Sequence, residues 1–303
     1  MAESRQWQGK TGGGKFGQEA LFFILKHLRV VFLYPILYII TPFNLLFGRK
    51  ATNSLKFYYR NIWKEGLLKS IGHSFLNELN FGKVVLDKFA VLAGHPEQFN
   101  IDIDKDDMDN FFHLLDQEKG IILAGSHIGN FELLGQRMTQ DKKHISCVIY
   151  AGERQQYQER RTIAFGHNDV SMIPVLPDLS HLFAIKEALD KGEIVAILCD
   201  RHHGGRKIKK CQFLGQDAYF PTGTFLLAAQ MEVPVLSTFI MKEKATYYKG
   251  FMKELHIHND EPSVTNRANE LLEKYIVSLE NILKKYPHQW FNFFQFWEKS
   301  TNN

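Results

Sequence analysis

Short apolar runs alternate with amphipathic segments through the middle of the chain. Residues 178–190 repeat apolar positions at helical spacing, whereas 144–150 and 193–199 are short apolar runs typical of buried strands. This alternation predicts an α/β fold with a mostly parallel central sheet flanked by helices. The remaining segments follow the same two patterns: we expect strands at 121–124, 171–176, 233–241 and 246–257, the last at a sheet edge, and helices at 53–94, 104–115, 153–165 and 262–285.

The N-terminal part has a different pattern, an uncharged run of eighteen residues at 30–47. That length is the lower limit for crossing a bilayer. Pro35 and Pro42 would bend a helix here, so the run is either one membrane-anchoring helix or a buried or interfacial helix. Basic residues lie on both sides, so charge does not predict its orientation. No small-residue cleavage site follows it, so a cleaved signal peptide is not expected.

Composition limits the class of protein. A chain of 303 residues with 45% hydrophobic residues can bury one large core. The net charge of +4 suits an anionic lipid surface or an acidic carrier protein, but it is too small to indicate a nucleic acid partner. Cys147, Cys199 and Cys211 have no C-x-x-C spacing, and no H-E-x-x-H, P-loop or G-x-G-x-x-G motif occurs. We therefore expect a reducing compartment and no metal, nucleotide or other cofactor.

The candidate chemistry lies just after the predicted strand at 121–124. His127 and Glu132 would point about 140° apart on one continuous helix. With His127 in a loop and Glu132 in the first helical turn, the carboxylate can reach the imidazole and orient it as a base. Gly129 leaves room for a substrate, and Asn130 can cap the helix, whose free N–H groups would meet a developing oxyanion. The alternative is an ordinary helix start, with His127 as its cap and Glu132 as a first-turn acid.

Further candidates follow later strands. Asp200 and Arg201 follow the run at 193–199, so parallel strands would bring them to the sheet edge that carries His127. Residues 201–210 include five Lys or Arg, which form either a solvated loop or a basic rim for a phosphate-bearing substrate or an acidic carrier. Asp200 and Arg201 are therefore candidate substrate-binding residues. Three more candidates each have a structural alternative: Thr222 and Gly223 at a helix start, and Arg161 on a helix face.

The segment Ser126-His127-Ile128-Gly129-Asn130-Phe131-Glu132 resembles the H-x4-[D/E] signature of the late lipid A acyltransferases, the lauroyl and myristoyl type. Phe213-Leu214-Gly215 and Phe220-Pro221-Thr222-Gly223 match the order of motifs in that family. The resemblance implies transfer of a fatty acyl group from an acyl thioester, on acyl-carrier protein or coenzyme A, to a hydroxyl of a membrane lipid such as a lipid A-type glycolipid.

The resemblance also bears on location. It favours the anchoring helix over the buried one, and implies a tail and anchor at 1–50, a catalytic domain at 51–303, and attachment to the cytoplasmic face of the inner membrane. One position departs from the family: Gln295 stands where an Arg is expected. In this the chain resembles relatives in Bacteroidetes-type lipid, aryl-polyene and flexirubin pathways, whose acceptor is not established as lipid A.

The mechanism that we expect is direct attack of the acceptor alcohol on the thioester. His127 takes the proton and Glu132 holds the imidazole tautomer. No G-x-S-x-G elbow occurs, so no acyl-enzyme is needed and Ser126 has a minor role. The aromatic-rich end at 290–297 is expected to pack into the core rather than on a membrane. Two other functions stay open, an acyl ester hydrolase and a non-catalytic lipid-binding subunit.

Overall fold

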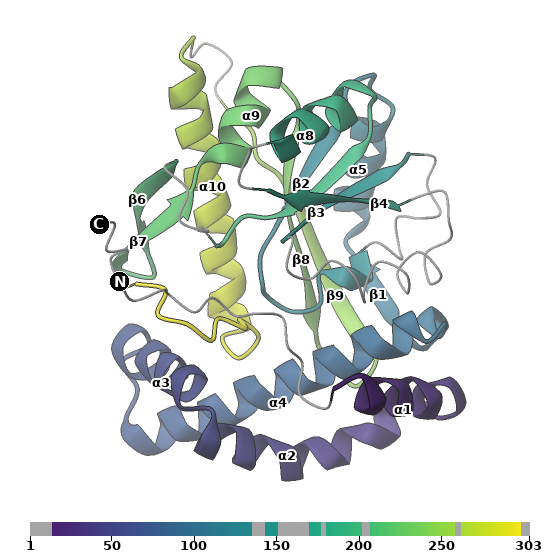
Figure 1. Ribbon diagram of the computed structural model, residues 1–303. Helices are drawn as coiled ribbons and strands as arrows, with labels where there is room; N and C mark the ends of the chain where they lie inside the picture. The colour runs from purple at the N-terminus through teal and green to yellow at the C-terminus, as the bar shows by residue number, and fades with distance from the viewer. Residues whose placement is uncertain are drawn as a thin grey trace.

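A seven-stranded sheet forms the centre of the computed structural model (Figure 1), which describes residues 14–134, 143–150, 170–176, 180–201, 207–257 and 262–297. The strand order is β1-β9-β8-β2-β5-β3-β4, and every neighbouring pair is parallel except β8 with β9. A separate antiparallel pair joins β6 to β7. The strands are β1 Asn100–Ile103, β2 Ile121–Gly125, β3 Ile145–Tyr150, β4 Val170–Val175, β5 Ile194–Leu198, β6 Ile208–Phe213, β7 Gln216–Pro221, β8 Val235–Lys242 and β9 Tyr247–Glu254.

Helices cover both faces of the sheet and extend below it. Asp104 caps α5 and Ser263 caps α10 through side-chain oxygens, which accept from Asp106 N and Asn266 N and so satisfy free donors of the first turns. The described helices are α1 Gly14–His27, α2 Tyr34–Phe47, α3 Arg49–Phe57, α4 Leu67–Leu92, α5 Lys105–Leu115, α8 Ser180–Asp190, α9 Gly223–Met231 and α10 Val264–Lys285, with short turns η1 Val30–Leu33, η2 Tyr58–Ile62 and η3 Pro96–Gln98.

The predicted α/β architecture is confirmed. Strand β2 is buried along its whole length, with Ile122 and Ala124 in one core cluster and Ile121 and Leu123 in another. This division between two clusters is expected of a strand that is covered on both faces. One detail was wrong: β9 is not an edge strand, because β1 pairs with it on the outside. The helix predicted at 153–165 lies outside the described residues.

The apolar N-terminal run folds along α4. Residues 30–47 form η1 and α2, and they are long and apolar enough to cross a membrane, yet Tyr34, Leu37 and Thr41 of α2 are buried. Tyr34 and Leu37 join Leu79 and Leu86 of α4 in a third core cluster. Figure 1 shows α1 and α2 below α4, with α2 running alongside it, and α3 at one end of α4. The run therefore has one buried stripe and a wide exposed face.

A buried ion pair connects these helices to the sheet. Asp87 of α4 bonds Lys242 at the end of β8, and it also accepts from the hydroxyls of Tyr34 and Tyr248. Lys242 Nζ lies 3.0 Å from Tyr34 Oη and 3.2 Å from Tyr248 Oη, and it bonds the carbonyl of Ala245. Burial raises the pKa of Asp87 and lowers the pKa of Lys242. The pair and the two tyrosines thus join α2 and α4 to the consecutive strands β8 and β9.

Two imidazoles join α4 to the C-terminal segment. Glu65 Oε1 lies 2.8 Å from Nδ1 of His73, whose ring centroid is 4.1 Å from that of His288. Nδ1 of His288 lies 3.1 Å from Tyr59 Oη. Burial, and secondly the charge of His73, lowers the pKa of His288 to about 4.

We expect this imidazole pair to destabilise the fold in mild acid. The pKa of His288 is about 4 in the folded chain against an ordinary value of 6.5, so the unfolded chain binds more protons between these values. The free energy of unfolding therefore falls as the pH falls through this window. In His288→Gln, this loss should shrink by about 1 kcal/mol, after a reduction for the solvent around a half-buried ring.

Chemical unfolding at pH 7 and pH 4.5 measures this effect. The matched control is His95→Gln, which removes an imidazole that is about one-third exposed and pairs with Glu97. The control should keep the pH dependence of the parent chain. Equal pH dependence in the parent and in His288→Gln would contradict the prediction.

Candidate active site

His127 lies in the turn that follows β2, and Asp200 lies two residues beyond the end of β5. These strands are parallel neighbours, with Gly125 opposite Leu198, so their carboxyl ends meet at one edge. Asp200 Oδ1 is 2.8 Å from His127 Nδ1, and Oδ2 accepts from the backbone N–H of His127 at 3.0 Å. The prediction that Asp200 joins His127 at this edge is confirmed.

The Asp200 carboxylate holds the imidazole in one orientation. Its side chain is 1% exposed and also accepts from Trp290 Nε1 at 3.3 Å. Burial alone would raise the pKa of Asp200, but the charge and hydrogen bonds of His127, together with Arg201, outweigh burial and lower this pKa to about 2. An ionised carboxylate only accepts hydrogen bonds, so Nδ1 of His127 carries the proton and Nε2 of the neutral ring is the basic nitrogen. The His127 side chain is 26% exposed, which leaves the ring accessible.

Glu132 is engaged elsewhere. Its carboxylate pairs with Lys88 of α4, whereas Nδ1 of His127 is bonded to Asp200. The carboxylate that contacts the imidazole is therefore Asp200 and not Glu132, which was predicted to hold the imidazole tautomer. The physical reason is topological, because the neighbouring parallel strand delivers Asp200 directly beside His127. Glu132, in the helical turn that follows, lies against α4 instead.

Gly129 and Asn130 shape the turn. Gly129 N donates to Gln289 O at 2.9 Å and Asn130 N donates to Ile240 O at 2.7 Å, so the backbone N–H groups of both residues are bonded within the protein. Their contact with a substrate stays a prediction. Gly129 has φ +56°, and an added Cβ would lie 2.0 Å from Ile240 O. Asn130 is buried, with Nδ2 3.5 Å from Tyr248 Oη. Only glycine fits at 129, because the turn presses against β8.

Ser126 is buried beside His127. Tyr275 Oη donates to Gly125 O at 2.8 Å and bonds Ser126 Oγ. Because the tyrosine proton goes to the carbonyl, Ser126 donates to the tyrosine oxygen. This arrangement agrees with the minor role expected for Ser126, since a buried hydroxyl with a bonded proton is poorly placed to attack a substrate.

Arg201 connects the site to the C-terminal segment. Its Nη2 donates to Phe291 O at 2.9 Å, and its guanidinium lies 5.2 Å from the ring centroid of Phe294. The residue is half-buried and directly follows Asp200. It therefore supplies a held positive charge at the edge that carries His127.

The structure says little about substrate binding at three other predicted positions, Thr222, Gly223 and Arg161. Thr222 does not cap α9 through its side chain, because its hydroxyl donates to Lys207 O at 3.2 Å instead. Gly223 has open space around its Cα, and in the described part of the chain no recorded contact joins either residue to His127. Arg161 lies outside the described residues.

The C-terminal segment forms one wall of the site, which sequence reasoning missed. Phe291 N donates to His127 O at 2.9 Å, and Ile128 and Trp290 form an isolated antiparallel bridge. Trp290, Phe291 and Phe296 are buried, which confirms core packing for this aromatic-rich end. Gln289 fixes the segment to β8, because its side chain accepts from Lys242 N at 2.9 Å and donates to Lys242 O at 2.8 Å. The high density of aromatic residues at 290–297 was the feature of the sequence that could have indicated this wall.

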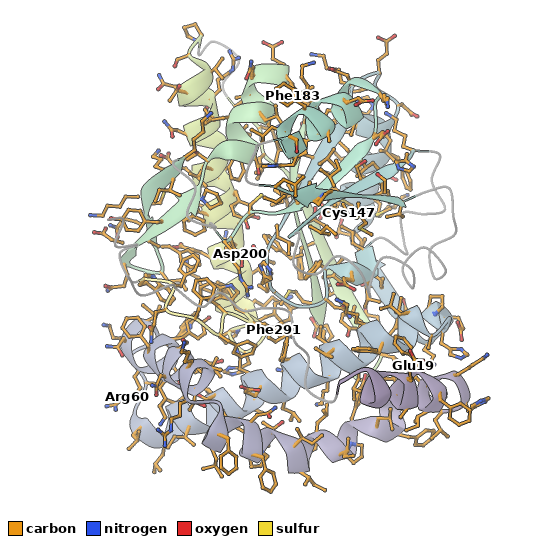
Figure 2. The ribbon with its side chains drawn as sticks, in the orientation of Figure 1. Glu19, Arg60, Cys147, Phe183, Asp200 and Phe291 are labelled. Atoms are coloured by element: carbon orange, nitrogen blue, oxygen red, sulfur yellow. The ribbon has the colours of Figure 1, made fainter. Side chains whose placement is uncertain are left out.

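Figure 2 shows Asp200 at the centre of the molecule and Phe291 between it and α4. An accessible imidazole, held by a buried carboxylate at the carboxyl edge of a parallel sheet, can remove a proton from an alcohol or a water molecule. A search of curated proteins found no match. A family model described as bacterial lipid A biosynthesis acyltransferase matches residues 77–299, a range that contains the whole site. From this match over most of its length, the chain belongs to the family of bacterial lipid A biosynthesis acyltransferases.

Proposed function

We propose that this acyltransferase is a membrane-associated O-acyltransferase that moves a fatty acyl group from an acyl thioester to a hydroxyl of a lipid acceptor. The observation that carries the proposal is the His127–Asp200 pair, with a contact of 2.8 Å to Nδ1 and the ring partly exposed. An alcohol is a weak nucleophile at neutral pH, so its attack gains most from a base that is already oriented.

The reaction proceeds by direct transfer. His127 Nε2 takes the hydroxyl proton as the acceptor oxygen attacks the thioester carbonyl, and Asp200 stabilises the imidazolium that forms. The tetrahedral intermediate collapses with cleavage of the carbon–sulfur bond, and the departing thiolate takes the proton from the imidazolium. Arg201, held against Phe291 O, supplies positive charge for the oxyanion or for a substrate phosphate.

The other predicted residues take supporting parts. Gly129 shapes the turn through its close approach to Ile240, and Asn130 fixes the same turn to β8. Glu132 positions the turn through its ion pair with Lys88 on α4. Thr222, Gly223 and Arg161 stay predictions as substrate-binding residues.

Family membership and the positive net charge support the proposed substrates and location. The donor is acyl-carrier protein carrying a thioester, with acyl-coenzyme A as the alternative, and the acceptor is a lipid A-type glycolipid or a related membrane lipid. The site faces the cytoplasm at the inner membrane. We retain the division into an N-terminal tail and anchor at 1–50 and a catalytic domain at 51–303.

The test is a product analysis. Purified protein is incubated with radiolabelled acyl-carrier-protein thioester and membrane lipid, and the products are separated by chromatography and identified by mass spectrometry. We expect label in an acylated lipid. Release of label only as free fatty acid would identify a hydrolase and overturn the proposal, because the same base can activate water.

The two candidate carboxylates are separable by mutation. Asp200→Asn should lower kcat about a hundredfold, since a hydrogen bond to an ionised group contributes about 1.5–3 kcal/mol and the amide no longer stabilises the imidazolium. Glu132→Gln should lower kcat less than tenfold, because Glu132 pairs with Lys88. Steady-state kinetics at saturating donor measure both. A larger loss in Glu132→Gln than in Asp200→Asn would return the orienting role to Glu132.

A further inference from the structure

The underside of the molecule carries most of its exposed apolar side chains. Fifteen of the twenty large apolar side chains that are exposed in the described residues lie between positions 23 and 76. They come from α1, η1, α2 and the first turns of α4, which we call the apolar base. Its most exposed members on α1, η1 and α2 are Phe23, Phe32, Ile39, Phe43, Leu46 and Phe47.

The charge around the apolar base has one sign. Residues 20–64 contain no Asp or Glu and seven Lys or Arg, all of them exposed: Lys26, Arg29, Arg49, Lys50, Lys56, Arg60 and Lys64. The positive charge of this segment exceeds the net +4 of the whole chain. An apolar face with a basic border is complementary to a bilayer surface that contains anionic lipids.

Helix α2 is too firmly held against α4 to cross that bilayer, because Tyr34, Leu37 and Thr41 are buried. Tyr34 donates to Asp87 Oδ1 at 2.6 Å, and Tyr34 Oη lies 2.8 Å from Ala245 O. Crossing would pull Tyr34 away from the buried Asp87–Lys242 pair and would expose the buried stripe that packs on α4.

We propose that the apolar base lies flat in the interface of one leaflet of an anionic bilayer and that no part of residues 20–64 crosses it. The basic border contacts the headgroups and the exposed side chains of α1, η1 and α2 enter the upper acyl region. This attachment does not depend on the proposed reaction.

Its consequence for substrate access does rest on the proposed function. Helix α4 is the element shared by the base and the site, because Asn77 Nδ2 donates to Trp290 O at 3.1 Å and the rings of Phe81 and Phe291 lie 5.2 Å apart. Packed helices are separated by about 8–10 Å. A lipid acceptor would therefore have to raise its headgroup past α4 and the C-terminal segment to reach His127, without leaving the membrane.

Topology is the first test. Single cysteines are placed before and after the apolar run, as Ala20→Cys and Asn53→Cys, in a chain whose half-buried Cys147 and Cys211 are serine. Both positions should react with a membrane-impermeant maleimide in sealed inverted vesicles, and neither in spheroplasts. Labelling of the two positions from opposite sides would show a spanning helix and overturn the proposal.

Vesicle binding is the second test. Phe43→Asp with Phe47→Asp should weaken sedimentation with phosphatidylcholine–phosphatidylglycerol vesicles at least tenfold, because two exposed rings no longer enter the acyl region. The control is Phe183→Asp on α8, a ring that is 76% exposed and lies at the opposite end of the molecule (Figure 2). The control should bind as the parent does.

Transfer to a detergent-solubilised acceptor separates this proposal from the proposed function. The Phe43→Asp, Phe47→Asp protein should keep its activity in detergent while it loses vesicle binding. Unchanged vesicle binding overturns the membrane base, and so does a change only in oligomeric state, which would assign the face to a second copy of the chain. If the parent protein transferred no acyl group to the detergent-solubilised acceptor, this result would contradict the proposed function and not the membrane attachment.

Discussion

Replacing His127 by alanine is expected to lower kcat for acyl transfer by about 10³- to 10⁴-fold, the upper part of the range for a positioned base. The physical reason is that the substitution removes the proton acceptor and leaves Asp200 as a buried carboxylate without its main partner. The acceptor alcohol must then lose its proton to water, whose oxygen is neither basic enough nor held in place. Transfer of labelled acyl groups at saturating donor and acceptor measures the loss.

Ser126→Ala is the matched control for His127→Ala. It changes the adjacent residue and removes a hydroxyl that is buried and bonded to Tyr275. We expect its kcat to stay within about threefold of the parent, since a residue without covalent chemistry should not affect the chemical step. If His127→Ala kept more than a tenth of the parent activity, the imidazole would not be the base. A non-catalytic lipid-binding role for the protein would then be favoured.

The acid side of the activity profile follows from the same pair. The pKa of Asp200 is held at about 2, so this carboxylate stays ionised well below neutral pH. The stability that it contributes is present above its ordinary pKa near 4 and is lost only as the pH falls through about 2. A decline in rate between pH 7 and pH 4 therefore does not come from protonation of the carboxylate that orients the imidazole.

Local patterns predicted the parts of the site that depend on one strand and its neighbour. The apolar run at 121–124 and the run before Asp200 are both recognisable as buried strands, and parallel pairing then requires their ends to meet. Even without coordinates, Asp200 and His127 could thus be assigned to one edge. The prediction that Glu132 contacts the imidazole was made without knowledge of its partner Lys88, which lies on a helix whose packing no local pattern specifies.

Contacts across long sequence separations account for the other differences. Gln289 bonds the backbone of Lys242 and supplies the carbonyl that accepts from Gly129, but nothing in the sequence around these residues indicates that they meet. Strand β1 has only four residues, two of them polar, so its pattern is too short to predict a strand that covers β9. The sequence pattern predicted an apolar helical run at 30–47, as observed. Its packing along α4 was not predicted, because it depends on a few buried positions such as Tyr34 and Thr41.

The second large effect is expected at the buried Asp87–Lys242 ion pair, which Tyr34 contacts. Lys242→Met should lower the free energy of unfolding by about 3–5 kcal/mol, the usual cost of leaving one charge of a buried pair without its partner. Asp87 has no exposed side-chain surface and Lys242 only 6%. Tyr34 and Tyr248 would still donate to the carboxylate, but they bring no positive charge. Chemical unfolding in a mild detergent at pH 7 measures the change.

Two comparisons test the cause of that loss. Lys249→Met breaks a more exposed pair with Asp102 and should change the free energy of unfolding far less, because solvent screens that pair. Asp87→Asn added to Lys242→Met removes the uncompensated charge and should restore much of the stability. Equal losses in Lys242→Met and Lys249→Met would mean that the buried charge is not what destabilises the variant.

The pH dependence of the stability of Lys242→Met is an independent test of the buried-charge explanation. Burial already raises the pKa of Asp87, and loss of the ammonium group raises it further. A carboxyl whose folded pKa lies above its unfolded value stabilises the fold when protonated, and this contribution is lost as the pH rises through the folded pKa. Lys242→Met should therefore be closer in stability to the parent at pH 5 than at pH 8. Because Tyr34 bonds the same carboxylate, α2 should loosen from α4 first in this variant, which faster hydrogen exchange over residues 34–47 would detect.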